Sequence, residues 1–361
     1  MTEGRDAAAA SRAAGRPPRT PRLLTAAALV VVIAGVKAAG ALILPVLVAA
    51  LLTVLAAPTV MWLERRHVPS ALSVVVVILG LLASVALFVV LLSTGLRGFD
   101  DALPAYQDGV LGLWAGARAW LADRGVVVTT EASLQLFDPS AVMKTMSSLL
   151  GTVVAALSNT ALVLIVVVFM VLEVSGFPGK LRAALSDPAA DLSRWEKAMS
   201  DVQRYLAIKT VICAATGALI AIWLWLIGVN FPILWGVLAF MLNYIPSIGS
   251  FVAAAPTLMV AMVQPDLGSG AVGLVALGYV VVNVSLGNLL EPQLMGRRFR
   301  LSALVVFLSL LFWGWVWGPL GMLLSVPLTM AARIVMEQHS STHWVAVLLG
   351  PPLPNPTSTT D

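Results

Sequence analysis

Residues 283–327 read NVSLGNLLEPQLMGRRFRLSALVVFLSLLFWGWVWGPLGMLLSVP, and they indicate how the chain is organised. An apolar segment ends at Glu291, a basic turn follows at 297–300, and a second apolar run is interrupted between Gly314 and Gly321. Glycine weakens a helix and proline removes a hydrogen-bond donor, so carbonyl groups freed at such a break need partners in protein or water. A continuous lipid-exposed helix has no use for this sequence at its centre.

The composition places the chain in a membrane. It is 59% hydrophobic and 11% charged, whereas soluble domains carry about 25% charged residues. Runs of about 20 apolar residues recur along the chain, as a hydrocarbon core about 30 Å thick requires. The fold class predicted is therefore an all-α polytopic membrane protein. We expect no nucleic-acid partner, because the basic residues cluster beside the apolar runs.

Few residues of the types that bind metals or form disulfides are present. Cys213 is the single cysteine, and the three histidines (67, 339 and 343) lie outside the apolar runs. One cysteine cannot form an intrachain disulfide, and no metal cluster is indicated. We expect neither a metal nor another cofactor.

The N-terminal third predicts a basic tail and three spans. Residues 1–22 are rich in Ala, Arg and Pro, which predicts a disordered cytoplasmic tail under the positive-inside rule. A signal peptide is the alternative, but no small-residue cleavage site precedes a soluble domain. Residues 23–96 form a three-span unit, with predicted spans at 23–36, 41–63 and 71–96.

The middle of the chain is less apolar. Residues 97–147 carry more acidic than basic groups, which suits the outer face, and apolar residues recur at helical spacing between Leu103 and Leu121. This amphipathic helix lies in the interface, packs on a neighbouring subunit or covers its own membrane domain. A fourth span is predicted within 148–172, and a cytoplasmic interfacial helix within 173–205.

Residues 206–335 are predicted to form the transport core, followed by a cytoplasmic tail at 336–361. Two apolar segments, 231–263 and 303–334, are each too long for one crossing and are broken near the middle. If both are re-entrant hairpins, the basic turn at 297–300 lies in the cytoplasm, as the positive-inside rule requires.

The preferred topology is six full spans plus two opposed re-entrant hairpins, eight hydrophobic segments in all, and the alternative is eight full crossings. The layout is that of an inverted repeat, in which broken helices commonly hold the substrate. The residues expected to break or gate the hairpins are Pro246, Gly249, Gly314, Gly318, Pro319, Gly321 and Pro327.

Several motifs resemble one family of bacterial membrane proteins, the autoinducer-2 exporter family. The similarity covers most of the chain, and its specific part is residues 287–292 (GNLLEP), 307–310 (FLSL), 313–315 (WGW) and 321–329 (GMLLSVPLT). The break at 246–249 (PSIG) is similar to a Pro-aromatic-Ile-Gly-Pro element of the family, but Ser247 stands in place of the aromatic residue and Ser250 in place of the second proline.

The resemblance implies a function and an assembly. It implies export of autoinducer-2, a small polyhydroxylated quorum-sensing signal, across the bacterial cytoplasmic membrane. It also implies a homo-oligomer, a pentamer. The positive-inside rule places both termini in the cytoplasm. Some members of the family resemble sodium/proton antiporters, so antiport or export of another small solute is the alternative function.

A neutral polyol needs hydrogen-bonding groups rather than a strong charge. The candidate substrate-binding residues are Asn243, Ser247, Asn283 and Asn288, with Ser250 and Ser285 nearby. Each could instead join neighbouring helices or cap free backbone groups. Glu291 is the candidate for ion or proton coupling, with an interfacial ion pair to the nearby arginines as the alternative. Lys209 is expected to extend to the lipid headgroups.

Two other classes of protein were weighed against a transporter. An intramembrane enzyme would need a Ser/His or paired-Asp arrangement, and the predicted spans contain neither. A non-transporting oligomeric scaffold would explain the amphipathic helix but not the two broken segments. We therefore predict a transporter and not an enzyme.

Overall fold

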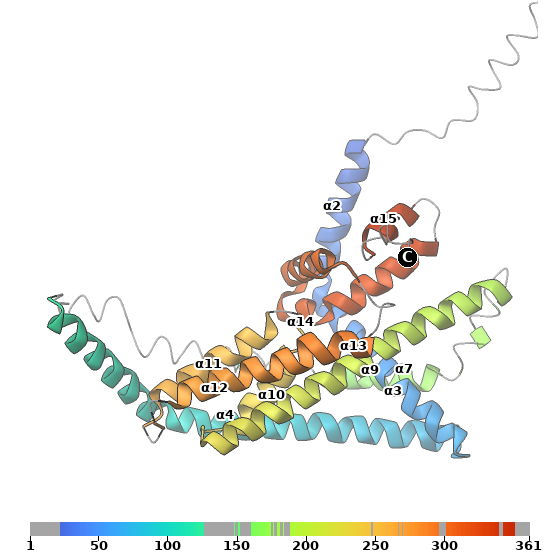
Figure 1. Ribbon diagram of the computed structural model, residues 1–361. Helices are drawn as coiled ribbons and strands as arrows, with labels where there is room; N and C mark the ends of the chain where they lie inside the picture. Colours follow the sequence, from blue (N-terminus) through green and yellow to red (C-terminus); the bar gives the residue numbers. More distant parts are fainter. Residues whose placement is uncertain are drawn as a thin grey trace, which may run out of the picture. The chain divides into compact units, whose positions relative to one another are not determined.

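A computed structural model describes residues 22–125, 148, 151, 160–174, 176, 179–180, 183, 188–246, 248–265, 267–268, 270–295, 301–338 and 342–350 (Figure 1). Within these ranges the regular structure is helical and no strand occurs. The prediction of an all-α protein is confirmed for this part of the chain.

The chain divides into two compact units, residues 1–44 and 45–361. In the first unit, α2 (Arg22–Ala38) is followed by a single turn residue, Ala39, before α3 (Gly40–Arg65) begins. The amide of Ala39 still donates to the carbonyl oxygen of Gly35 at 2.9 Å, so the helical bonding pattern continues almost to the start of α3. These two helices correspond to the first two predicted spans.

The second unit contains one unusually long helix. α4 (Ser70–Asp123) has 54 residues and runs without interruption through the expected boundary at 96/97. The predicted third span and the amphipathic segment are therefore parts of one helix. α7 (Thr160–Val174) packs against α4. Side chains from α3, α4 and α7 form one buried apolar cluster, which includes Ala49, Val60, Val74, Val77, Val167 and Val171.

Two helices pack closely at the centre of this unit. α9 (Pro188–Ile227) has 40 residues and is followed by α10 (Pro232–Leu242). A Cβ atom on Gly217 would lie 2.6 Å from the carbonyl oxygen of Gly236, so this contact has room only for glycine. Small residues of this kind let membrane helices approach closely.

The first broken segment folds back on itself. α10 ends at Leu242, the chain turns through residues 243–248, and α11 (Gly249–Val263) packs against α10. Trp235 and Phe99 are fully buried, with ring centroids 5.9 Å apart, in the core that α10 and α11 share with α4. The turn lies within the stretch where the sequence predicted the break.

The next helical segment changes its hydrogen-bonding pattern along its length. α12 (Ala271–Val282) continues into η1 (Asn283–Leu290), a π-helix of eight residues, and then into α13 (Glu291–Met295). Helices of the π type are rare and are found frequently at functional sites. The amino-acid sequence did not predict this change from an α-helix to a π-helix.

The second broken segment is also doubled back. α14 (Ala303–Gln338) departs from helical geometry at Trp317 and at Gly318, whose φ is 67° and ψ is −147°. The Ser309 hydroxyl donates to the carbonyl oxygen of Ser325 at 3.0 Å, although 16 residues of straight helix would span about 24 Å. The two halves of α14 are therefore antiparallel, and α15 (His343–Leu348) packs against them.

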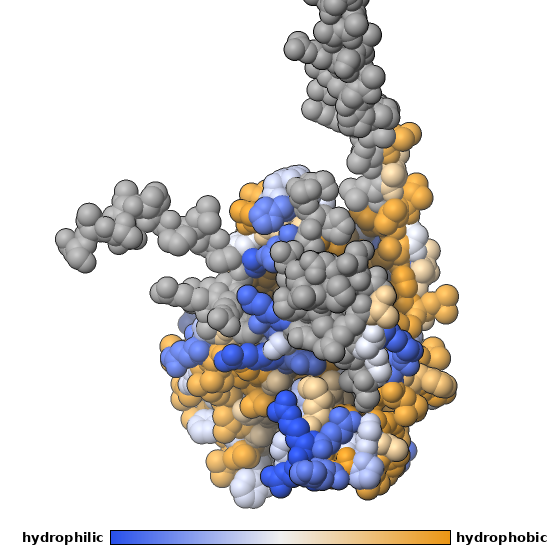
Figure 2. Space-filling view, turned by 90° about the vertical axis from the view of Figure 1, so that its right-hand side faces the viewer, coloured by the Kyte–Doolittle hydropathy of each residue, from blue (hydrophilic) through white to orange (hydrophobic). Residues whose placement is uncertain are grey.

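The surface agrees with a membrane location. Five described helices are long and apolar enough to cross a bilayer by length and composition, and shorter apolar helices accompany them. The fold-back of α14 means that its 36 residues do not make one straight crossing. Large apolar side chains are exposed, including Phe169, Trp225 and Phe251, and apolar residues cover much of the face shown in Figure 2. The side from which each fold-back enters the membrane stays a prediction.

Candidate functional site

One face of α9 carries an unusual run of polar side chains. Lys209, Cys213 and Thr216 are spaced by four and three residues, which places them on the same side of a helix. All three are buried, with 5%, 0% and 3% of their surface exposed. Buried polar groups need hydrogen-bond partners, so the contacts of this face identify its neighbours.

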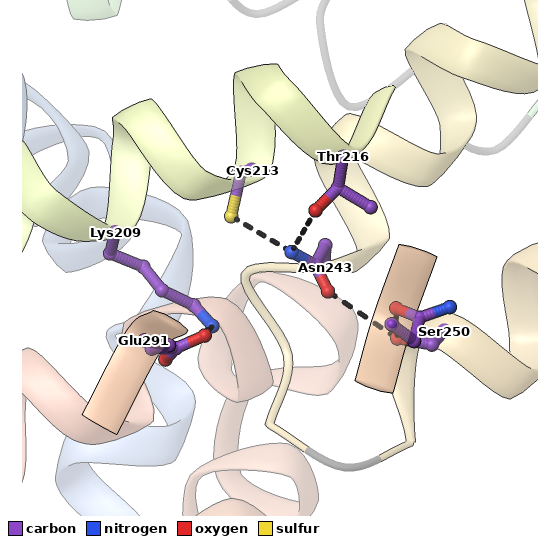
Figure 3. Close-up of polar contacts among 7 residues, drawn as sticks. Lys209, Cys213, Thr216, Asn243, Ser250 and Glu291 are labelled. Atoms are coloured by element: carbon purple, nitrogen blue, oxygen red, sulfur yellow. Dashed lines mark hydrogen bonds and ion pairs between the residues drawn. The ribbon is translucent and has the colours of Figure 1, made fainter. Parts of the chain in front are cut away.

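Asn243 supplies the first of these contacts. It follows the last residue of α10, where the chain enters the turn, and is 8% exposed. Its amide nitrogen donates to Thr216 Oγ1 at 3.4 Å and lies 3.6 Å from Cys213 Sγ (Figure 3). The side chain of Asn243 therefore joins the turn between α10 and α11 to α9.

Ser250 connects this turn to the π-helix. Its hydroxyl oxygen lies 3.3 Å from Asn243 Oδ1 and 2.6 Å from Asn283 Oδ1. A serine hydroxyl has only one proton to donate, so it cannot satisfy both amide oxygens at once. The asparagine that does not receive this proton has an amide oxygen that can accept a hydrogen bond from another hydroxyl group.

Asn283 is oriented by its own helix. Its amide nitrogen donates to the carbonyl oxygen of Tyr279 at 2.8 Å, which points the amide oxygen toward Ser250. The Tyr279 hydroxyl in turn lies 2.9 Å from Thr257 Oγ1, a buried residue of α11. The network thus continues from α9 through the turn to α11, α12 and η1.

An ion pair joins α9 to the start of α13. Lys209 Nζ lies 2.9 Å and 3.0 Å from the two carboxylate oxygens of Glu291, the residue directly after η1 (Figure 3). The exposed side-chain fractions are 6% for the lysine and 19% for the glutamate. The expectation that Lys209 extends to the headgroups was wrong, because the ammonium group is buried and pairs with a largely covered carboxylate.

Hydroxyl groups extend the network on the same part of α9. The Tyr244 hydroxyl donates to Thr210 Oγ1 at 2.7 Å, and the Thr210 hydroxyl donates to the carbonyl oxygen of Leu206 at 2.8 Å. Tyr244 follows Asn243 in the turn, so two consecutive turn residues bind α9. Such paired contacts fix the position of the turn against the helix.

The structure separates the four predicted substrate-binding residues. Asn243 and Asn283 come together through Ser250, 40 residues apart in sequence. Asn288 is exposed and no described contact joins it to this network, and Ser285 is exposed on the same π-helix. Ser247 lies outside the described residues.

The predicted break residues lie at or near the two turns. Pro246 is in the first turn, and a Cβ atom on Gly249 would come within 1.8 Å of the carbonyl oxygen of Leu242. In α14, Gly318 has the positive φ, Pro319 follows it, and a Cβ atom on Gly321 would lie 2.0 Å from the carbonyl oxygen of Trp313. Gly314 packs against Met322, and Pro327 lies inside the second half of the hairpin.

Sequence reasoning missed several members of the network. The sequence-based prediction of the site did not include Thr210, Cys213, Thr216 or Tyr244. The spacing of residues 209, 213 and 216 indicates a polar face on one helix and could have predicted part of the network. Among the described residues, no group of three or more His, Cys, Asp and Glu side chains could hold a metal ion.

The fold and this site together define a class of protein. Long apolar helices, an exposed apolar surface and a buried polar network beside a folded-back helix pair are typical of a polytopic membrane transporter. The chain belongs to the AI-2E family of transporters, because the model of that family, described as "AI-2E family transporter", matches residues 26–341.

Individual relatives match over most of their length. The chain is 37% identical over 315 residues to "AI-2 transport protein TqsA" of Escherichia coli strain K12, covering 87% of this chain and 91% of that protein. It is 36% identical over 323 residues to "Putative transport protein YhhT" of the same strain, covering 89% and 91%. A Haemophilus influenzae protein named "Putative transport protein" is 36% identical over 325 residues, covering 88% of this chain and 92% of that protein. The prediction of the family is confirmed.

Proposed function

We propose that this transporter exports autoinducer-2 or a closely similar small polyhydroxylated molecule from the cytoplasm. The proposal is supported by the relative named as an AI-2 transport protein, which matches 87% of this chain. We further propose that the protein lies in the bacterial cytoplasmic membrane with both termini in the cytoplasm. We also propose that it assembles as a homo-oligomer, a pentamer.

The shared hydroxyl of Ser250 is the observation that carries the proposal. Asn243 Oδ1 and Asn283 Oδ1 compete for a single donated proton, so one amide oxygen is open to a hydroxyl group of a substrate. A substrate hydroxyl has both a proton to donate and lone pairs to accept with. A polyol can therefore replace the internal bond without leaving a buried polar group unpaired.

The site also suits a neutral molecule because its charges are paired. Lys209 and Glu291 are close enough to cancel one another, and the other members of the network are amides, hydroxyls and a thiol. We place the substrate between the α10–α11 turn, α9 and η1. The two helical fold-backs would act as opposed re-entrant hairpins, and Gly249 and Gly318 would set their turns.

Flux from proteoliposomes tests the function directly. Vesicles that contain the protein are loaded with autoinducer-2, and its release is compared with release from protein-free vesicles. The proposal predicts protein-dependent release that Asn243→Ala slows. Ser285→Ala, a change at an exposed residue of η1, should leave the release unchanged. Equal release from vesicles with and without the protein would disprove it.

Sodium/proton antiport is the second candidate, because Glu291 is a carboxylate on a helix of a candidate membrane span. It predicts that an imposed sodium gradient changes the internal pH of the vesicles and that Glu291→Gln abolishes the change. The two candidates separate cleanly, since antiport requires no release of autoinducer-2.

A further inference from the structure

We propose that the Lys209–Glu291 pair sets the charge selectivity of the site, with Glu291 cancelling the positive charge of Lys209 so that neutral solutes are accepted and anions are not favoured. This inference rests on the proposed function, because it concerns the same site. It assigns Glu291 a role in specificity rather than in carrying a proton or an ion.

Lys209 is deeply buried. It is the one buried charged residue in the part of the chain that the structure describes, with 5% of its surface exposed. An unpaired ammonium group in such a place is costly, and a bidentate carboxylate contact offsets much of that cost. The pair as built is electrically neutral, so its field at a distance is that of a dipole and not of a charge.

The position of the pair also bears on selectivity. Lys209, Cys213 and Thr216 share a face of α9, and Asn243 contacts both of the latter. Thr216 is seven residues from Lys209, about 10 Å along the helix. On the opposite element, Asn283 begins η1 and Glu291 directly follows its end. The ion pair and the amide–hydroxyl network therefore share one face of α9, and both reach the segment 283–291.

The π-helix sets the register between Asn283 and Glu291. A residue of an α-helix turns the chain by about 100°, whereas the wider π-helical turn, with i→i+5 bonds, turns it less. Over the eight residues of η1 this difference accumulates. The same segment in α-helical form would direct one of these side chains to a different neighbour, so the π-helix lets Asn283 reach Ser250 while Glu291 reaches Lys209.

A single charge at this distance acts strongly on a charged solute. In a protein environment with an effective dielectric constant of about 20, a unit charge about 10 Å away changes the affinity for another unit charge roughly tenfold. Glu291→Gln exposes the charge of Lys209 and favours anions. Lys209→Met exposes the charge of Glu291 and favours cations. The double variant Lys209→Met, Glu291→Met restores neutrality.

The experiment compares three small polyols in proteoliposomes: erythritol, which is neutral, erythronate, which is an anion, and serinol, which is a cation. The expected result is a rise of about tenfold in the erythronate-to-erythritol flux ratio for Glu291→Gln and a matching rise for serinol in Lys209→Met. The double variant should return both ratios to native values. Glu337→Gln, which removes the partner of Arg333 in a pair 2.9 Å apart, is the matched control and should leave the ratios unchanged.

The measurements distinguish a failure of the charge-selectivity inference from a failure of the proposed substrate. Unchanged flux ratios in both single variants, or no flux of any probe through native and variant protein, overturn the charge-selectivity inference. Opposite shifts in the two single variants support it, even if the native protein fails to release autoinducer-2. That last result would disprove only the proposed substrate. A purely structural ion pair would lower all three fluxes together.

Discussion

Asn243 and Asn283 compete for one proton, the hydroxyl proton of Ser250, which lies 3.3 Å from the first amide oxygen and 2.6 Å from the second. Asn243 lies in the turn between α10 and α11, whereas Asn283 is the first residue of the π-helix η1. Their contact through one hydroxyl couples the turn to the π-helix. A solute that takes over either bond would alter that coupling.

Removing the shared hydroxyl should slow transport. Ser250→Ala leaves both amide oxygens without this donor, at a cost of about 1 kcal/mol in the free energy of unfolding. We expect autoinducer-2 release from proteoliposomes to fall several-fold. Ser285→Ala, an exposed serine on η1, is the matched control, and equal effects of the two variants would contradict the assignment.

The two candidate asparagines should differ in importance. Asn243 is buried and bonded to α9, whereas Asn288 is exposed. We expect Asn243→Ala to reduce release strongly and Asn288→Ala to leave it near the native rate. A larger effect of Asn288→Ala, measured at equal protein density in the vesicles, would place the site elsewhere on η1.

Breaking the buried ion pair should destabilise the protein. Glu291→Gln leaves the Lys209 ammonium group buried without its counter-ion, which costs about 3 kcal/mol. The double variant Lys209→Met, Glu291→Met should recover much of that loss. Thermal unfolding in detergent measures both effects, and a double variant no more stable than Glu291→Gln would argue against a coupled pair.

The turn of α14 should depend on glycine at one position. Gly318 has a φ of 67° and a ψ of −147°, a region open essentially to glycine alone. Gly318→Ala should cost about 1–3 kcal/mol in the free energy of unfolding. Gly116→Ala serves as the control. Gly116 lies in α4, and a Cβ atom at this position would have no neighbouring atom within 4 Å. Equal unfolding midpoints for both variants would contradict a strained turn.

Thiol labelling tests whether the first fold-back is re-entrant. On a Cys213→Ser background, Ile248→Cys places a single thiol in the turn between α10 and α11. A re-entrant turn near the midplane predicts slow reaction with membrane-impermeant maleimides from either side. Rapid labelling from the cytoplasmic face would show that α10 crosses the membrane completely, and it would contradict a re-entrant turn.

The sequence allowed the class, the early helices and the sites of chain reversal to be predicted. Apolar run length located α2 and α3, because a bilayer demands about 20 apolar residues whatever their neighbours are. Glycine and proline located the reversals at 243–250 and 314–321, because these residues act on the local backbone.

The contacts of the site could not be predicted in the same way. Lys209 and Glu291 are 82 residues apart, and their contact depends on how α9 packs against η1. Lipid-facing and buried surfaces of these helices are both apolar, so sequence periodicity does not show which face turns inward. The sequence of η1 likewise carries no distinct signal for a π-helix.

The length of α4 has a consequence for how the protein meets its surroundings. A helix of 54 residues is about 80 Å long, whereas the hydrocarbon core is about 30 Å thick. Even a strongly inclined α4 must therefore carry several turns beyond the lipid. Those turns would give an antibody fragment a rigid epitope, and one bound there could enlarge this 37.9 kDa protein for single-particle imaging without touching the transport site.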